Sequence, residues 1–202
     1  AASLAEAGLD ALLCFKQETM YWLGGYDTFG FCFFQCLVLR ADGDMALLTR
    51  SADLRQAQLT STLDDIRIWV DRDGANPAEQ LRDLLESKGL RGKRLGVEYE
   101  THGLTAANGK RLEAALDGFA ELVDAALLVS RLRLVKSPAE LAYVRKAAGL
   151  ADEFARSGPL RPLGCGFAEL AGQRFDVVIN ATSASLSDAA PDLPDGLYAP
   201  GS

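Results

Sequence analysis

The sequence lacks features that would place it in several well-defined classes of protein. No apolar run is long enough to span a membrane, because the longest, residues 29–39, is interrupted by Gly30 and Gln35. Basic residues are in deficit, since 28 Asp and Glu oppose 21 Lys and Arg and leave a net charge of −7. A chain with this charge does not bind nucleic acid or an anionic membrane through its overall field. We therefore predict neither a nucleic-acid partner nor a membrane partner.

Metal-ligating residues are also scarce. His102 is the only histidine, and the four cysteines (Cys14, Cys32, Cys36 and Cys165) include no CxxC pair. Cys32 and Cys36 have no further Cys or His at the spacing of a zinc site. We therefore predict no metal site and four free, buried thiols in a reducing cytoplasm.

The chain of 202 residues is 49% hydrophobic and 24% charged, which is typical of a globular protein. Its length suits one large domain, or one medium domain with a fragment attached. The first residues, Ala1-Ala2-Ser3, are neither an initiator methionine nor a signal peptide with a basic n-region. We therefore expect a trimmed or interior piece of a longer chain.

Residues 1–150 alternate between the hydrophobic patterns of strands and helices. Strands are expected over residues 9–15, 31–39, 45–49, 65–71, 94–98 and 119–123, and helices over residues 17–23, 52–59, 77–88, 104–116, 125–134 and 138–156. Ser51 is positioned to cap the second of these helices, and Ser137 with Glu140 forms a capping box for the last. The pattern predicts an α/β fold, a three-layer domain with a mixed β-sheet flanked by helices.

The composition changes near Leu150. From there onward the chain contains no Lys and holds five of the seven Pro. Strand patterns over residues 160–165 and 175–180 enclose a short helical pattern over residues 167–171. This order predicts a short, grafted βαβ element, right-handed by default, followed by a loop.

Several segments of the first part carry a family resemblance. They are Leu9-Asp10-Ala11-Leu12-Leu13, Tyr21-Trp22-Leu23-Gly24-Gly25-Tyr26, the hairpin at Asp42-Gly43, Leu95-Gly96-Val97-Glu98, and the stretch from Leu132 to Leu141. With these motifs, residues 1–149 resemble the N-terminal domain of the creatinase/prolidase (Xaa-Pro peptidase) family. The last stretch matches the linker helix that leads into that family's catalytic domain.

This resemblance implies a second domain that binds two metal ions through Asp, Asp, His, Glu and Glu. The family pattern stops near Ala151, and His102 lies inside the N-terminal domain. We therefore expect no catalytic residue, no metal ligand and no peptidase activity. In the family, the N-terminal domain helps to form a dimer and can lend side chains to a neighbour's active site. Residues 28–31 match the region that does so.

The remainder carries a different resemblance. Residues 175–186, 167–170, 193–197 and 150–154 are similar to parts of the NADP domain of shikimate dehydrogenase. The resemblance implies that Asn180, Ala181, Thr182 and Ser183 form a loop that lies beside NADP in that family. The family's Gly-rich turn, its Asn-Arg-Thr element and its catalytic Lys and Asp are missing. We therefore treat the loop as vestigial and expect no cofactor; the alternative is a simple strand-end turn.

Other candidate site residues have plainer interpretations. Asp71, Asp73, Glu98 and Glu100 could form a carboxylate site, but solvated strand ends explain them as well. His102 is expected in a loop or at a helix cap. An aromatic cluster is interpreted as core or dimer surface rather than as a ligand cage. It comprises Tyr21, Trp22, Tyr26, Phe29, Phe31, Phe33 and Phe34.

Together these patterns predict a chimera, artificial or recombined, that joins residues 1–149 to a fragment formed by residues 150–202. Such a chain has no complete active site and is not expected to be an enzyme. The first alternative is a binding or scaffold module that self-associates, as a homodimer, through surfaces exposed by the missing domains. The second is weak NADP binding through residues 180–183.

Overall fold

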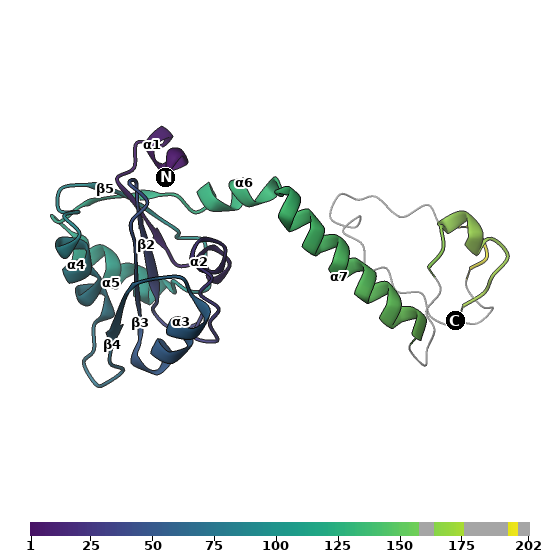
Figure 1. Ribbon diagram of the computed structural model, residues 1–202, viewed down its shortest axis with the longest axis horizontal. Coiled ribbons are helices and arrows are strands. Elements are labelled where there is room, and N and C mark those ends of the chain that lie inside the picture. The colour runs from purple at the N-terminus through teal and green to yellow at the C-terminus, as the bar shows by residue number, and fades with distance from the viewer. Residues whose placement is uncertain (158–163, 176–193, 198–202) are drawn as a thin grey trace. The chain divides into compact units, whose positions relative to one another are not determined.

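The computed structural model describes residues 1–157, 164–175 and 194–197 (Figure 1). The chain divides into two compact units, residues 1–135 and 136–202, and each is described by itself. The first unit contains a six-stranded mixed sheet with the order β4-β3-β2-β1-β5-β6. Its strands are β1 (Ala11–Cys14), β2 (Cys36–Arg40), β3 (Met45–Arg50), β4 (Asp65–Trp69), β5 (Arg94–Val97) and β6 (Glu121–Asp124).

The sheet combines antiparallel and parallel pairs of strands. Strands β2 and β3 form an antiparallel hairpin in which Cys36 pairs with Leu48, and the turn includes Gly43 with a positive φ of 94°. β1 pairs antiparallel to β2 and parallel to β5. β3 with β4, and β5 with β6, are parallel pairs joined through helices. The predicted mixed sheet is therefore confirmed.

Side chains of the central strands alternate between two hydrophobic cores, as the two-residue period of a strand requires. On β1, Leu13 enters one core and Leu12 the other; on β2, Val38 and Leu37 divide in the same way. A sheet buried on both faces needs helices on both faces, which gives the three predicted layers.

One face is covered by α4 (Pro77–Ser87) and α5 (Ala106–Leu116), which lie to the left of the sheet in Figure 1. Helix α4 begins at Pro77, where the missing N–H costs nothing, and Leu81, Leu84 and Leu85 form its buried stripe. Thr105 caps α5 by accepting a hydrogen bond from the Asn108 backbone N–H.

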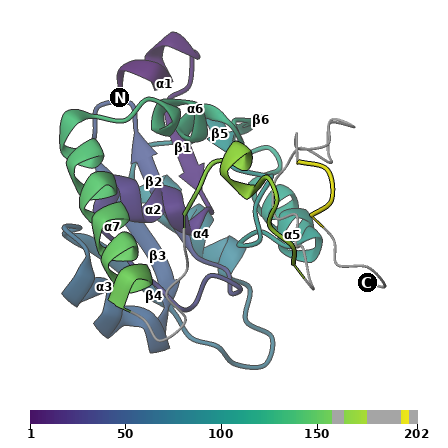
Figure 2. The same cartoon turned by 90° about the vertical axis from the view of Figure 1, so that its right-hand side faces the viewer.

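The other face is covered by α1 (Ala2–Glu6), α2 (Gln17–Gly24), α3 (Leu54–Thr60) and α6 (Leu128–Leu134). Each contributes one or more buried residues to the second core, namely Leu4, Met20, Ala57 and Val129. Figure 2 looks onto the side that carries α2 and α3. Helix α2 ends where expected, because Gly25 adopts a left-handed conformation with a φ of 73°.

Two expectations about elements are wrong. The strand predicted over residues 31–39 begins only at Cys36. Residues 31–33 form a turn in which the Phe33 N–H donates to the Gly30 carbonyl, and residues 34–35 have no regular structure. Ser51 does not cap a helix with its side chain. It opens a 3-10 turn, Ser51–Asp53, and α3 follows directly from that turn.

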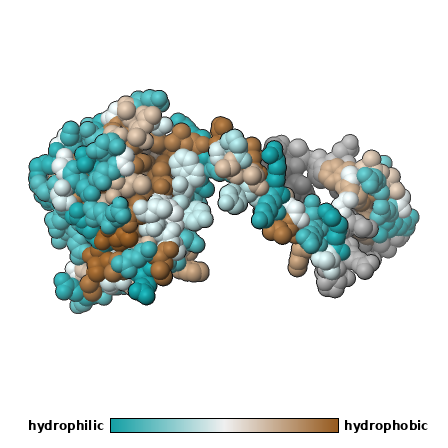
Figure 3. Space-filling view, in the orientation of Figure 1, coloured by the Kyte–Doolittle hydropathy of each residue, from teal (hydrophilic) through white to brown (hydrophobic). Residues whose placement is uncertain are grey.

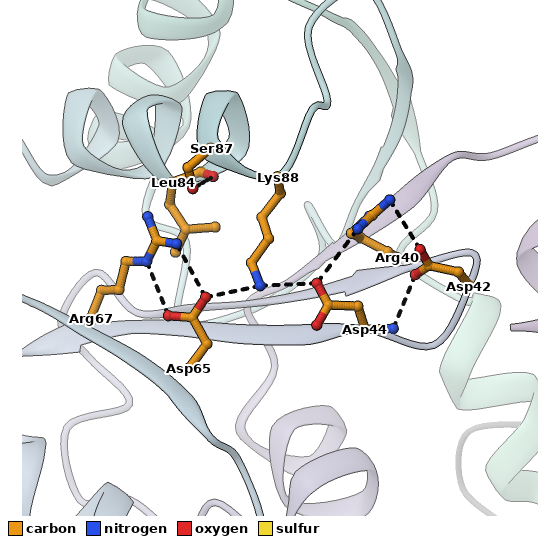
Figure 4. A network of polar contacts seen from close by, with 8 residues as sticks. All are labelled: Arg40, Asp42, Asp44, Asp65, Arg67, Leu84, Ser87 and Lys88. Atoms are coloured by element: carbon orange, nitrogen blue, oxygen red, sulfur yellow. Dashed lines mark hydrogen bonds and ion pairs between the residues drawn. The ribbon is translucent and has the colours of Figure 1, made fainter.

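An ion-pair network joins the β2–β3 hairpin, β4 and the end of α4 (Figure 4). The Lys88 Nζ lies 2.9 Å from Oδ2 of Asp44 and 2.9 Å from Oδ2 of Asp65. Arg67 donates two hydrogen bonds to Asp65, at 3.0 and 3.1 Å. The network therefore links three elements that are far apart in the sequence.

The second unit begins with α7 (Pro138–Ser157), for which the predicted capping box is confirmed. The Ser137 N–H donates to Glu140 at 2.7 Å, and the Glu140 N–H donates to the Ser137 Oγ at 3.3 Å. The helix predicted over residues 167–171 is a 3-10 turn, η2 (Phe167–Leu170). Most of the two strands predicted for the βαβ element, and residues 180–183, lie outside the described residues.

Candidate functional site

The most distinctive feature of the first unit is the loop between α2 and β2, whose residues 28–34 we call the aromatic loop. Phe29 is 89% exposed, and Phe31 and Phe33 are exposed as well. Tyr26 and Phe34, at either end of the loop, are buried. The aromatic cluster predicted from the sequence therefore divides into a buried pair and an exposed set, to which Tyr21 and Trp22 of α2 also belong.

Buried polar side chains hold the aromatic loop in one conformation. Thr28 and Gln35 are each at most 3% exposed. The Thr28 Oγ1 accepts from the Gly30 N–H at 2.8 Å, and the Gln35 Nε2 donates to the Gly30 carbonyl at 2.8 Å. The Gln17 side chain donates to the Thr28 carbonyl at 2.7 Å. These bonds satisfy backbone groups that a loop would otherwise leave to water.

Gly30 is required by a close approach. A Cβ at this position would lie 2.2 Å from the Gln35 Nε2 and 2.7 Å from the Asp53 Oδ2. Both distances are far below van der Waals contact, and both neighbours are buried. A side chain at residue 30 would therefore displace the groups that hold the loop.

Arg50 connects this buried cluster to the exposed aromatic rings. Its Nε lies 3.2 Å from the Asp53 Oδ2, and its guanidinium carbon lies 3.6 Å from the centre of the Phe33 ring. Such a cation–π contact orients the ring as well as attracting it. Beneath the loop, the Tyr26 hydroxyl lies 3.0 Å from the Thr49 Oγ1, and burial raises the pKa of Tyr26. The loop is thus a preformed apolar surface on a polar support.

The four candidate carboxylates are not gathered into one site. Glu98 is fully buried at the end of β5 and accepts from the Phe15 N–H at 3.1 Å, the Lys16 N–H at 3.0 Å and the Thr19 hydroxyl at 2.7 Å. The expectation of a solvated strand end is therefore wrong for Glu98, which holds the start of α2. Burial raises its pKa.

The other carboxylates line two separate cavities. Asp71 and Asp73 line a cavity of about 550 Å³, whereas Glu100 lines one of about 400 Å³ together with His102. His102 lies in the loop after β5, as expected. Within the described part of the chain, no three His, Cys, Asp or Glu side chains are grouped to hold a metal ion.

Two of the cysteines differ from expectation. Cys14 and Cys36 are buried, as predicted, and burial raises the pKa of both thiols. Cys32 and Cys165 are exposed, because one lies in the aromatic loop and the other just before η2. All four are free thiols. None of the helices that the structure describes is both long and apolar enough to cross a membrane.

Sequence reasoning identified the aromatic side chains but missed the polar residues that support them. Gln35, Arg50 and Asp53 come from the loop end, the end of β3 and the following turn. The only signal in the sequence was Gln35, which interrupts the longest apolar run. The arrangement can bind an apolar surface, since it presents exposed aromatic rings.

The profile of the creatinase/prolidase N-terminal domain matches residues 1–135, the same residues that form the first unit. The chain therefore belongs to the creatinase/prolidase family through this N-terminal domain. A curated relative, an uncharacterised hydrolase/peptidase from Sinorhizobium fredii, is 32% identical over 146 residues. That match covers 69% of this chain and 37% of the relative.

A second kind of relative also matches. A shikimate dehydrogenase (NADP(+)) from Dechloromonas aromatica is 52% identical over 73 residues, which are 34% of this chain and 26% of that protein. The chain thus spans well under half the length of both curated relatives.

Solved structures share the fold. A dipeptidase from Pyrococcus horikoshii has a TM-score of 0.60 and 24% identity, over 75% of this chain and 40% of that one. The N-terminal domain of the cytoplasmic peptidase PepQ from Mycobacterium tuberculosis has a TM-score of 0.50 and 26% identity, over 65% of this chain and 92% of that one.

Proposed function

We propose that this chain acts as a non-catalytic interaction module that forms a homodimer through its aromatic loop. The observation that carries this proposal is the combination of three exposed phenylalanines, Phe29, Phe31 and Phe33, with a buried polar support. A rigid apolar surface loses little conformational entropy when it binds, and aromatic rings contribute strongly to interfaces. Figure 3 shows apolar side chains at the surface of the first unit.

Sedimentation equilibrium over a range of concentrations tests the proposal. We expect the full chain to form dimers. The double variant Phe29→Ser/Phe31→Ser should have a dimer dissociation constant at least tenfold higher. Leu59→Ser is the matched control, because Leu59 is an exposed apolar residue on α3 outside the loop. A monomer at every concentration, or equal dissociation of the variant and the control, would overturn the proposal.

We propose further that the chain joins pieces of two families and has no complete active site. Matches to a hydrolase/peptidase and to a shikimate dehydrogenase support the joining. The missing Gly-rich turn indicates that residues 180–183 do not bind NADP tightly. Calorimetric titration with NADP should therefore show no saturable binding below millimolar concentration, and tight binding would contradict this proposal. Release of proline from an Xaa-Pro dipeptide in the presence of Mn²⁺ would contradict the lack of peptidase activity.

A further inference from the structure

Helix α7 is the longest helix that the structure describes, and it separates apolar from charged side chains (Figure 1). At about 3.6 residues per turn, all of its charged residues after Glu140 lie on one half of its circumference. The other half is the apolar face of α7, which consists of Leu141, Tyr143, Val144, Ala147, Ala148, Leu150, Ala151, Phe154 and Ala155. The helix therefore has one side that is suited to packing.

No described residue covers the apolar face of α7. Tyr143 is 77% exposed and Phe154 is 78% exposed, and no residue of the helix is buried. A helix in a protein owes most of its stability to the packing of its apolar face. Gly149, in the middle of α7, lowers the helix propensity further. A stable α7 therefore needs a partner for this face.

Charged residues follow the same order along both edges of the apolar face. On one edge, Arg145 is followed two turns later by Asp152. On the other edge, Lys146 is followed two turns later by Glu153. Residues seven positions apart on a helix lie nearly above one another. Each edge is therefore basic in its first half and acidic in its second half.

Most of these edge charges have no partner among the described residues. No described residue forms an ion pair with Arg145, Lys146 or Glu153. The Asp152 Oδ2 lies 3.9 Å from the Arg156 Nη2, but the two side chains are 71% and 78% exposed, so solvent weakens this pair. The edges can therefore form ion pairs with another molecule.

The order of these charges fits one direction of pairing between two copies of α7. In an antiparallel pair of helices, each edge of the apolar face meets the same edge of the other copy, running in the opposite direction. Arg145 of one copy then lies beside Asp152 of the other, and the same holds for Lys146 and Glu153. In a parallel pair the two different edges meet, so that Arg145 lies beside Lys146 and the two acidic residues lie side by side. Only the antiparallel pair therefore brings opposite charges together.

Small residues at the centre of the apolar face allow a close approach. Ala147, Ala148 and Ala151 lie around the midpoint of such an antiparallel pair, whereas Tyr143 and Phe154 lie toward its ends. The distance between two packed helices depends on the side chains at their contact, and alanine permits a short distance. The exposed rings at the ends then gain stability by being buried.

We propose that α7 pairs in the antiparallel direction with α7 of a second copy of this chain, through its apolar face and both charged edges. Charge complementarity selects both the partner and the direction, because the edges are complementary to themselves. This surface belongs to the second unit, whereas the aromatic loop belongs to the first. The pairing of α7 therefore does not rest on the function proposed for the loop.

Sedimentation equilibrium of full-length variants tests this pairing. All of them carry Phe29→Ser/Phe31→Ser, which we call the serine background, so that association through the aromatic loop is weakened. We expect the serine background to form a dimer at high concentration through α7. A monomer at every concentration would overturn the proposal and would show that α7 is covered by something other than a second copy.

Charge reversal in the serine background tests the direction. Arg145→Glu/Lys146→Glu makes both edges acidic throughout, and it should raise the dimer dissociation constant about tenfold or more. Adding Asp152→Lys/Glu153→Lys gives each edge two signs again, in the opposite order. This fourfold variant should return to within about threefold of the serine background. A fourfold variant that stays dissociated would overturn the antiparallel pairing.

The matched control is Arg55→Glu/Lys110→Glu in the same background. Both residues are exposed, on α3 and α5, and the change in net charge is the same. Equal effects of this control and of the reversal on α7 would overturn the assignment. The serine substitutions test the loop while α7 is unchanged, so failure of one surface is distinguishable from failure of the other.

Discussion

At the scale of single residues, two buried polar contacts decide the local structure of the first unit. Gly30 leaves room for Gln35 and Asp53 beneath the aromatic loop. Glu98 accepts three hydrogen bonds at the point where β1 ends and α2 begins. At Glu98, the backbone N–H groups of Phe15 and Lys16 are satisfied by a residue more than 80 positions away in the sequence, so that a single substitution leaves them without that partner.

Gly30→Ala should destabilise the chain by roughly 1–3 kcal/mol, because the new Cβ overlaps buried atoms of Gln35 and Asp53. Gly109→Ala is the matched control. Gly109 lies inside α5, and nothing lies within 4 Å of an added Cβ, so this change should stabilise the chain by about 0.5–1 kcal/mol. Urea unfolding measures both variants. Equal stabilities would show that the contacts at Gly30 are looser than described.

Glu98→Ala should cost roughly 1–3 kcal/mol for each buried N–H that it leaves unpaired, at Phe15 and Lys16. Glu98→Gln should cost much less, because its amide can accept from one backbone N–H or both while the Thr19 hydroxyl turns to accept from the amide N–H. Urea unfolding at neutral pH separates the two variants.

The same carboxyl group makes stability depend on pH. Burial raises the pKa of Glu98 above its ordinary value of 4.5. The stabilisation that comes from this pKa shift is fully present below that value and is lost as pH rises through the folded-state pKa. In Glu98→Gln this decline should disappear from the curve of unfolding free energy against pH. Identical pH dependence in the variant and the original chain would show that Glu98 does not titrate in this way.

At the scale of elements, the Lys88 network joins a hairpin, a strand and a helix end (Figure 4). The hydrogen bond from Lys88 lowers the pKa of Asp44, and the hydrogen bonds from Arg67 contribute most to lowering that of Asp65. Lys88 itself has a raised pKa because it donates to both aspartates. The side chains remain partly exposed, so solvent weakens each pair.

Lys88→Met should therefore cost only about 0.5–1 kcal/mol at neutral pH. The stabilisation by lowered aspartate pKa values is present above the ordinary value of 3.8 and is lost as pH falls through the folded-state values. The difference between variant and original chain should thus vanish in acid and shrink at high salt. Lys110→Met, an exposed change on α5, is the control and should show neither effect. A difference that persists at low pH would point to lost packing instead.

At the scale of the whole molecule, both hydrophobic cores consist only of residues from the first unit. Helix α7 begins the second unit and buries none of its residues. The boundary between the two units, at residues 135 and 136, precedes α7. The predicted junction between the two family resemblances lies within α7, at residues 149 and 150. The boundary of the folded unit therefore does not coincide with the proposed junction between the two families.

A shortened chain of residues 1–135 should unfold cooperatively. Its urea midpoint should be close to the midpoint at which the first unit unfolds within the full chain. Its cores are complete, and the comparable N-terminal domain from Mycobacterium tuberculosis was solved by itself. Circular dichroism at increasing urea concentration provides the measurement. Loss of the cooperative transition on shortening would show that residues 136–202 supply a necessary part of the core.

Much of the fold was predictable because its signals are local. The buried stripe of α4, the start at Pro77, the stop at Gly25 and the capping box of α7 each depend on residues within a few positions of one another. The three layers followed from the alternation of strands and helices. The late start of β2 at Cys36 was not predictable, since the aromatic residues before it favour strands wherever they occur.

The sequence by itself determined the class of fold, the order of its elements and the membership of residues 1–135 in the creatinase/prolidase family. Only the tertiary structure decided what supports the aromatic loop. The reason is physical. The β2–β3 hairpin and the turn after β3 bring Gln35, Arg50 and Asp53 together, and these side chains bond to one another where the fold buries them. A periodic pattern records which face of an element is apolar, but it does not record which polar groups that burial brings together.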